Sequence, residues 1–474
     1  MSFAEYSAYD GLGLAALVAR GEVTPDELLE IAIARLEAVN PRINAIAGRL
    51  YEEARGAIAG GLPAGPFAGV PFATKDLDVA VKGARLTNGS RLFRDRAMDH
   101  DATLVARYRA AGLVLFAQTT TPEFGLTVTT ESALFGPTRN PWNLERVAGG
   151  SSGGAAAAVA AGIVPVAQGS DGGGSIRVPA SCCGLFGLKP SRGRTPHGPL
   201  RLDGWNGLSM AHVISRSVRD SAALLDATEG PEPGTSLSPP SEERPYLEEV
   251  QRPPRRLRIA LVTETPEGTP IHPDCLDAVR GAASLLDALG HIIEEAPLPF
   301  DGEALRKALA TIAASHTHRI LEDLAAARGS AIAAGEVEPV TAAIAKIGGR
   351  TGAADLVRAL DATQTAAIAW ARFTETFDMA LSPTLAKPPL ELGVISLTPE
   401  RFERFGPEFN EFTPFTAAHN ATGAPAMSVP LYWNAEGLPI GVMLAGRFGD
   451  EATLFRLAGE LERAHPWADK RAPL

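Results

Sequence analysis

The sequence predicts an α/β protein, in which strands and helices alternate along the chain. Short apolar runs bounded by glycine and proline, such as FAGVPFAT at 67–74, are typical of buried strands. Apolar residues three or four positions apart, as at 273–289, have the period of a helix. Hydrophobic residues make up 45% of the 474 residues, which is enough for a large globular core.

The N-terminal part begins with a well-marked helix. Thr24 and Glu27 form a capping-box pattern at its start, and we expect it to end at Asn40-Pro41. The strand at 67–74 ends at Lys75, which places this lysine deep in the protein. A helix at 101–111 then leads into a strand at 113–118, and a long loop is expected to continue through Gly150.

The rest of the chain continues the alternation. An Ala-rich helix is expected at 153–161, a buried strand at 163–169, and a glycine cluster at 172–174. Residues 228–256 are rich in Pro, Glu and Ser and predict an exposed linker. The elements expected beyond it are a strand at 257–263, a helix at 273–289, a helical region at 303–376, and strands at 378–383 and 425–433, with a hairpin turn at 435–437.

Composition narrows the kind of partner. The formal net charge of -11 opposes binding to nucleic acid or to an anionic membrane, because both need clustered Lys and Arg. The apolar run at 153–167 is too short for a membrane span, and the first residues lack a signal-peptide pattern. We therefore expect a soluble cytoplasmic protein that acts on a small molecule.

The cysteines predict neither a disulfide framework nor a metal site. Cys182 and Cys183 are adjacent and Cys275 is distant, so the spacing fits no known ligand set. Reduced thiols packed as small apolar side chains are expected. No metal or organic cofactor is predicted.

The segment with the clearest chemistry begins at Gly149. Glycines surround Ser151 and Ser152, and a second glycine run leads directly into Ser175. Successive N–H groups in such a run can form a concave anion-binding nest. A hydroxyl beside preorganised donors is what acyl transfer requires.

A serine nucleophile needs a base, and Lys75 is the best candidate. Burial disfavours the ammonium form and can lower a lysine pKa by several units, leaving an amine that accepts a proton. No histidine lies in the glycine-rich loops, since His100, His197, His212 and His419 are scattered. The spacing alone leaves open that Lys75 is a surface residue or pairs with Asp76.

Four sequence blocks then carry a family resemblance. GVPFATKDL (69–77), FGPTRNPWN (135–143), GGSSGG (149–154) and GSDGGGSIRVPA (169–180) together resemble the amidase signature family. The similarity extends to LFGLKPSRGR, ATGAPAMSVPL and GLPIGVMLAG. Within the family, RPYLEEV, RNPWNL and the segment 272–291 resemble most the bacterial amidases that hydrolyse the cyclic dimer of 6-aminohexanoate.

The resemblance implies a fold, a reaction and a set of catalytic residues. It implies a large mixed sheet with helices on both faces, and hydrolysis of a linear, aryl or cyclic amide to a carboxylate and an amine or ammonia. Lys75 would be the base, Ser151 a bridging serine after a cis peptide bond, and Ser175 the nucleophile that carries the acyl group. The oxyanion hole would be formed by the N–H groups of Gly172, Gly173, Gly174 and Ser175.

Supporting residues and regions can also be named. Ser152 and Ser170 are candidate hydrogen-bond partners, and Asp171 and Arg177 could form an ion pair that braces the glycine loop. Leu126, Trp205 and Phe415, together with Phe412, suggest an apolar substrate pocket. We expect one domain over 1–474, with a signature core at about 65–225 and a helical substrate-pocket region at about 303–376. A homodimer is possible.

Three other interpretations remain open. GGSSG also fits G-x-S-x-G, so Ser151 could be the elbow nucleophile of an α/β-hydrolase with His419 as its base. The chain could be the amidase-type subunit of an amidotransferase that acts on glutamine. It could also be a nucleotide-binding module, although it has no phosphate-loop motif at these glycines.

Overall fold

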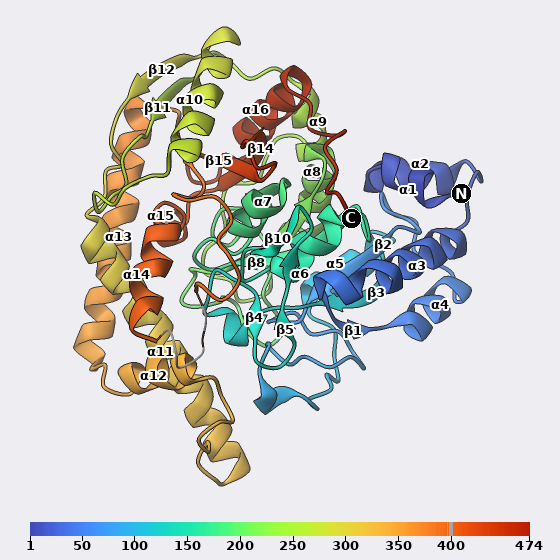
Figure 1. Cartoon of the computed structure of the whole chain (residues 1–474), viewed down its shortest axis with the longest axis horizontal. Helices are drawn as coiled ribbons and strands as arrows, with labels where there is room; N and C mark the ends of the chain where they lie inside the picture. Colours follow the sequence, from blue (N-terminus) through green and yellow to red (C-terminus); the bar gives the residue numbers. More distant parts are fainter. Residues whose placement is uncertain (396, 398–401) are drawn as a thin grey trace.

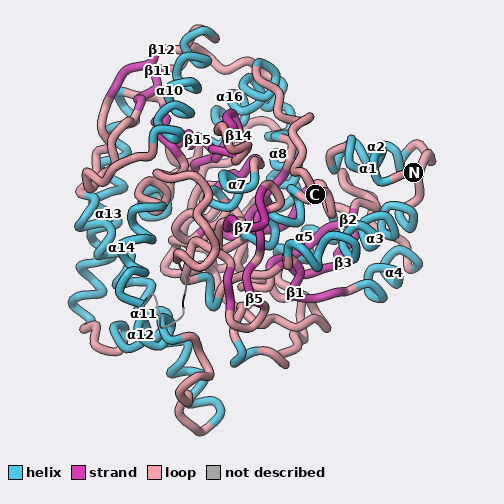
Figure 2. Tube along the Cα trace, viewed as in Figure 1, coloured by secondary structure: helices cyan, strands magenta, loops and turns pink. Residues whose placement is uncertain are grey.

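A large mixed sheet runs through the molecule. In the computed structural model, which describes residues 1–395, 397 and 402–474, eleven strands follow the order β1-β3-β2-β8-β10-β9-β14-β15-β13-β11-β12. Helices pack on both faces of this sheet (Figures 1 and 2). The predicted α/β class and the large mixed sheet are confirmed.

The sheet strands are β1 Ile46–Arg49, β2 Pro71–Lys75, β3 Val114–Thr119, β8 Val166–Asp171, β9 Phe186–Lys189, β10 Met210–Ser215, β11 Arg258–Leu261, β12 Ile292–Glu295, β13 Met379–Pro383, β14 Ala426–Trp433 and β15 Pro439–Ala445. Parallel pairing joins β2 to β3 and β8, and β11 to β12 and β13. The remaining pairs are antiparallel.

The helices of the first half are α1 Phe3–Ala8, α2 Gly11–Ala19, α3 Pro25–Ile43, α4 Tyr51–Ala59, α5 Thr103–Ala110, α6 Gly153–Ala160, α7 Arg177–Cys183 and α8 Val218–Thr228, with the 3-10 turns η1 Arg91–Phe93 and η2 Glu123–Gly125. The helices of the second half are α9 Tyr246–Gln251, α10 Pro273–Ala288, α11 Gly302–Arg328, α12 Pro339–Gly348, α13 Ala353–Thr376, α14 Phe402–Phe412, α15 Ala418–Thr422 and α16 Glu451–Ala464. Helices α11 to α14 gather along one side of the molecule (Figure 1).

Helix α3 starts as predicted and ends later than predicted. The capping box of Thr24 and Glu27 is present, and Pro25 occupies the first turn. The helix continues through Pro41 to Ile43, because Val39 and Ile43 are buried on its inner face and tertiary packing outweighs the proline. The predicted end at Asn40-Pro41 is therefore wrong.

The segment expected as one long loop before Gly150 contains short strands. These are β4 Glu131–Ser132, β5 Gly136–Pro137, β6 Arg139–Asn140 and β7 Asn143–Val147. The linker at 228–256 is largely exposed, but it contains α9, whose Tyr246 and Val250 are buried. Both segments are thus more ordered than their polar composition predicts.

Helix α6 lies unusually close to the neighbouring strand β3. A Cβ added at Gly154 would lie 2.4 Å from the backbone nitrogen of Thr120, so only glycine fits there. The four alanines that directly follow Gly154, at 155–158, are fully buried. The Ala-rich helix thereby fixes the position of the Ser151–Ser152 loop that precedes it.

Among the described residues, no helix combines the length and apolar character needed to cross a lipid bilayer. Cys182, Cys183 and Cys275 are free and buried.

Candidate active site

Strand topology brings the two glycine-rich loops to Lys75. Strands β2 and β8 are parallel neighbours, so their carboxyl ends meet at the same edge of the sheet. Lys75 is the last residue of β2, and β8 ends at Asp171, directly before the Gly172–Gly174 loop and Ser175. The site therefore forms from segments that are far apart in the sequence.

Lys75 is fully buried, and serine oxygens surround its amine. Its Nζ lies 2.8 Å from Ser151 Oγ and 3.1 Å from Ser170 Oγ. Burial lowers the pKa of Lys75 to about 7, while the carboxylates of Asp78 and Asp171 act in the opposite direction. A large fraction of this amine is therefore uncharged at neutral pH.

The neighbouring carboxylate of Asp76 is engaged elsewhere. It accepts hydrogen bonds from the backbone N–H of Thr87, at 2.7 Å, and from the Thr87 hydroxyl. The alternative that Lys75 is a surface residue is excluded by its burial, and Asp76 does not pair with it. The side-chain partners of the Lys75 amine are therefore the hydroxyls of Ser151 and Ser170.

Ser151 and Ser175 both open onto one cavity. The Gly150–Ser151 peptide bond is cis, and Ser151 is 2% exposed. Ser175 is 9% exposed, and its hydroxyl has no hydrogen-bond partner among residues 1–395, 397 and 402–474. The backbone N–H of Ser152 donates to the Ser175 carbonyl at 3.3 Å, which joins the two loops.

Three N–H groups of the second loop are free to bind an anion. Within the described part of the chain, those of Gly172, Gly173 and Ser175 have no protein acceptor. The N–H of Gly174 donates to Asp171 Oδ1 at 2.8 Å. Gly174 is therefore removed from the predicted set of oxyanion donors, because its hydrogen is already bound inside the loop.

The cavity has a volume of about 510 Å³ and is mainly apolar. Ser151, Ser170, Gly172, Gly173 and Ser175 line its base. The charged side chains of Asp78, Glu267 and Arg306 also line it. The larger apolar side chains around it are Leu77, Phe124, Leu126, Val128, Trp205, Leu208, Phe300, Leu305, Leu309, Ile344, Ile347, Phe405 and Phe409. Such a cavity suits a substrate with large apolar groups.

The pocket predictions are partly wrong. Leu126 and Trp205 line the cavity. Phe415 does not, because it packs in a core cluster with Ala424 and Ala426, and Phe412 is also a core residue. Of the helical region at 303–376, α11 and α12 contribute to the lining and α13 does not.

The nucleophile-elbow interpretation fails on geometry. The partner of Ser151 is Lys75, and His419 instead packs edge-on against Trp370, with ring centroids 4.8 Å apart. Burial and the nearby cations Arg177 and Lys189 lower the pKa of His419 well below its usual value. His419 is an aromatic-core residue rather than the base for Ser151.

Comparison with known proteins identifies the family. A family model described as Amidase matches residues 27–455.

The chain belongs to the amidase family.

Relatives within the family are similar over almost the whole chain. The 6-aminohexanoate-cyclic-dimer hydrolase of Paenarthrobacter ureafaciens is 39% identical over 98% of this chain and 96% of its own length. The solved structure of 6-aminohexanoate cyclic dimer hydrolase complexed with substrate matches with a TM-score of 0.93 at 38% identity, covering 98% of this chain and 99% of that chain. The resemblance predicted from the sequence blocks is confirmed.

Two further structures define the range of the match. A bacterial aryl acylamidase of the amidase signature enzymes is 27% identical with a TM-score of 0.86, covering 97% of each chain. A glutamyl-tRNA(Gln) amidotransferase structure from Thermotoga maritima is a more distant match, 26% identical with a TM-score of 0.76, covering 98% of this chain and 95% of that chain.

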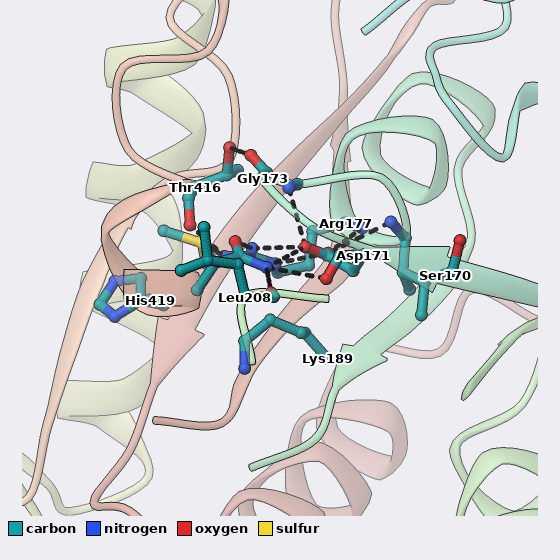
Figure 3. A network of polar contacts seen from close by, with 12 residues as sticks. Ser170, Asp171, Gly173, Arg177, Lys189, Leu208, Thr416 and His419 are labelled. Atoms are coloured by element: carbon teal, nitrogen blue, oxygen red, sulfur yellow. Dashed lines mark hydrogen bonds and ion pairs between the residues drawn. The ribbon is translucent and has the colours of Figure 1, made fainter. Parts of the chain in front are cut away.

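In this amidase-family chain, a buried ion pair underlies the glycine loop (Figure 3). Arg177 Nε and Nη2 each lie 2.9 Å from a carboxylate oxygen of Asp171, and both side chains are fully buried. Although burial acts to raise it, the Arg177 guanidinium holds the pKa of Asp171 well below its usual range. The predicted pair is present and joins the end of β8 to the start of α7.

Asn420 and Thr416 complete this network and were not predicted. Asn420 Nδ2 donates to Asp171 Oδ1 at 2.9 Å and to Leu208 O at 2.9 Å, and Arg177 donates to Asn420 Oδ1 at 2.7 Å. Thr416 Oγ1 donates to Gly173 O at 2.6 Å. Asn420 directly precedes the ATGAPAMSVPL block, which was the available signal.

Ser152 and Ser170 hold the two loops against each other. Ser152 Oγ accepts from Ser170 N at 3.2 Å and donates to Ser170 O at 3.2 Å. Ser170 Oγ contacts the Lys75 amine. Both predicted supporting serines therefore lie within the site.

Replacing Arg177 by methionine leaves the Asp171 carboxylate buried without its counter-charge. We predict a loss of about 3–5 kcal/mol in the free energy of unfolding, measured by urea denaturation. The matched control is Arg358→Met, which removes the exposed pair with Asp355 and should cost at most about 1 kcal/mol. Equal small losses in both variants would contradict the bracing role of the buried pair.

Proposed function

We propose that this protein hydrolyses carboxylic amides through an acyl-enzyme on Ser175. The observation that carries the proposal is the buried Lys75 amine, which lies 2.8 Å from Ser151 Oγ, while Ser151 and Ser175 both line the cavity. A base of this kind is what a serine nucleophile lacks on its own. Membership of the amidase family supports the same reaction.

Acylation moves one proton along the serines. Ser175 Oγ attacks the amide carbonyl and its proton passes to Ser151, whose own proton passes to the Lys75 amine. The tetrahedral intermediate then collapses as the C–N bond breaks, and the leaving nitrogen takes a proton from Ser151, which is replenished from Lys75. The products are the Ser175 ester and a neutral amine or ammonia.

Deacylation repeats the relay with water. Water loses a proton through Ser151 to Lys75 as its oxygen attacks the ester carbonyl, and the same proton returns to Ser175 Oγ as the acyl bond breaks. The second product is the carboxylic acid, and the resting enzyme is restored.

The oxyanion would be bound by the free N–H groups of the glycine loop. Gly172, Gly173 and Ser175 are available, and each such donor is worth about 10²- to 10³-fold in rate. Asp171 and Arg177 act as positioning residues, because they brace the loop without entering the cavity lining. Ser170 and Ser152 hold Lys75 and the two loops in register.

The cavity favours a substrate with substantial apolar groups. Linear, aryl and cyclic amides can all carry such groups. One relative is named a 6-aminohexanoate-cyclic-dimer hydrolase and one similar solved structure an aryl acylamidase. Glutamine, the substrate of the alternative amidotransferase reaction, is small and polar. Absence of glutaminase activity in the isolated chain would distinguish the two reactions.

A cytoplasmic location and a homodimeric state remain part of this proposal. The free buried thiols suit a reducing compartment. Light scattering on the purified protein tests the oligomeric state, and a monomeric mass would contradict the dimer.

The direct test is Ser175→Ala with a panel of aliphatic, aromatic and cyclic amides, anilides and esters. Loss of the nucleophile should lower kcat by about 10⁴-fold or more on every substrate of the wild type. Ser7→Ala, at a partly exposed site in α1, is the matched control and should retain full activity. Near-wild-type hydrolysis by the Ser175 variant would overturn the proposal.

The pH dependence tests Lys75 separately. The uncharged amine is the active form and its pKa is about 7, so kcat/KM should rise with pH through about 7 and level off above it. Lys75→Met should fold, lose most activity and lose this limb of the profile. If kcat/KM of the variant still rose through about pH 7 as in the wild type, Lys75 would not be the base.

A further inference from the structure

Trp205 covers the glycine that begins the free N–H array. A Cβ built on Gly172 would lie 3.4 Å from Trp205 Cε3 and 3.6 Å from its Cζ3, so the benzo edge of the indole lies against this backbone. Trp205 is half-buried and also packs with Phe124 and Leu126. The indole therefore forms the cavity wall beside the place where a substrate carbonyl would lie.

The turn that carries Trp205 has a sparsely populated backbone conformation. Trp205, Asn206 and Gly207 have φ values of 52°, 54° and 78°, all in the left-handed region. The turn lies between the bridge partners Gly204 and Ser209. Two consecutive non-glycine residues in this region persist only where surrounding contacts hold them.

Contacts from three separate segments hold this turn. A ring nitrogen of His316, on α11, lies 2.6 Å from Asn206 Oδ1. Arg192 Nε donates to Gly207 O at 2.6 Å, and Asn420 Nδ2 donates to Leu208 O at 2.9 Å. The wall is thus tied to the helical side of the cavity and to the network beneath the glycine loop.

We propose that Trp205 is the specificity-determining residue of the cavity and that it selects amides with a planar aromatic acyl group. The Asn206–His316 hydrogen bond is the latch that keeps the indole in place. The inference rests on the proposed function, because it states which part of the amide lies against Trp205 when Ser175 attacks the carbonyl.

The positions of Ser151 and Gly172 place the acyl group of the substrate, rather than its leaving nitrogen, beside the Trp205 indole. The leaving nitrogen must face Ser151 to receive its proton. The carbonyl oxygen would be held by the N–H of Gly172, against which the indole packs. A ring conjugated to that carbonyl shares its plane and meets the indole in an offset or edge-on contact.

Two amides with the same amine and equal acyl carbon number test the inference, N-butylbenzamide and N-butylheptanamide. Trp205→Ala should lower the ratio of their kcat/KM values, benzamide over heptanamide, about tenfold. Trp205→Phe should keep that ratio within about threefold of wild type, because a flat ring remains.

The Asn206–His316 hydrogen bond is tested with the same ratio of kcat/KM values, benzamide over heptanamide. His316→Ala should lower it about threefold, as expected for the loss of one hydrogen bond. Lys307→Ala is the matched control, since this exposed residue lies on the same helix and pairs only with Glu303 in the described structure; it should leave the ratio unchanged.

Two outcomes would overturn the inference. One is a Trp205→Ala variant with the wild-type ratio of kcat/KM values for the two amides. If that variant has a lower melting temperature but the same ratio, Trp205 has only a structural role and the inference is also wrong. A third amide, N-phenylheptanamide, carries the aromatic ring on its nitrogen instead of its acyl group. The other outcome is a fall in kcat/KM of Trp205→Ala that is confined to this third amide, which would place the indole on the leaving-group side. Both outcomes leave Ser175 chemistry standing, whereas the proposed function fails only if Ser175→Ala still hydrolyses these amides.

Discussion

The site depends on keeping one amine out of water beside hydroxyl oxygens. Lys75 ends a buried strand, so its charged form loses solvation, and Ser151 and Ser170 supply its polar contacts. Asp76, the nearest carboxylate in sequence, is bound to Thr87 and does not stabilise the ammonium form. The same amine in water would stay protonated and could not accept a proton from serine.

Burial alone does not make a lysine useful, as Lys189 shows. Burial lowers the pKa of Lys189 to about 7 as well, but its Nζ donates to the backbone carbonyl of Pro190, whereas the Lys75 amine contacts the hydroxyls of Ser151 and Ser170. The difference is topological. Lys75 lies at the sheet edge where β2 and β8 end together. The Asp171–Arg177 ion pair (Figure 3), together with Asn420, fixes the loop that leaves β8. The Asp171–Arg177 ion pair, the hydrogen bond from Gly174 to Asp171 and that from Thr416 to Gly173 hold this loop in place.

Short-range patterns in the sequence predicted much of the fold and of the candidate site. The features that were missed or wrong depend on contacts between residues distant in the chain. The capping box, the strand ending at Lys75 and the glycine-flanked serines are short-range patterns, and each is found in the structure. Pro41 inside α3 and the core position of Phe415 depend on neighbours distant in the chain. Asn420 and Thr416 were missed for the same reason, since only the fold brings them to the glycine loop. Gly174 was misassigned because its hydrogen bond to Asp171 is a detail of loop geometry.

The central claim is that burial brings the pKa of the Lys75 amine from its ordinary value close to neutral pH in the resting protein. The most direct measurement is an NMR titration of lysine labelled with ¹³C at Cε, with the Lys75 signal assigned by its disappearance in Lys75→Arg. The account predicts a midpoint near pH 7 for this signal. A midpoint near the ordinary lysine value of about 10.4 would contradict it.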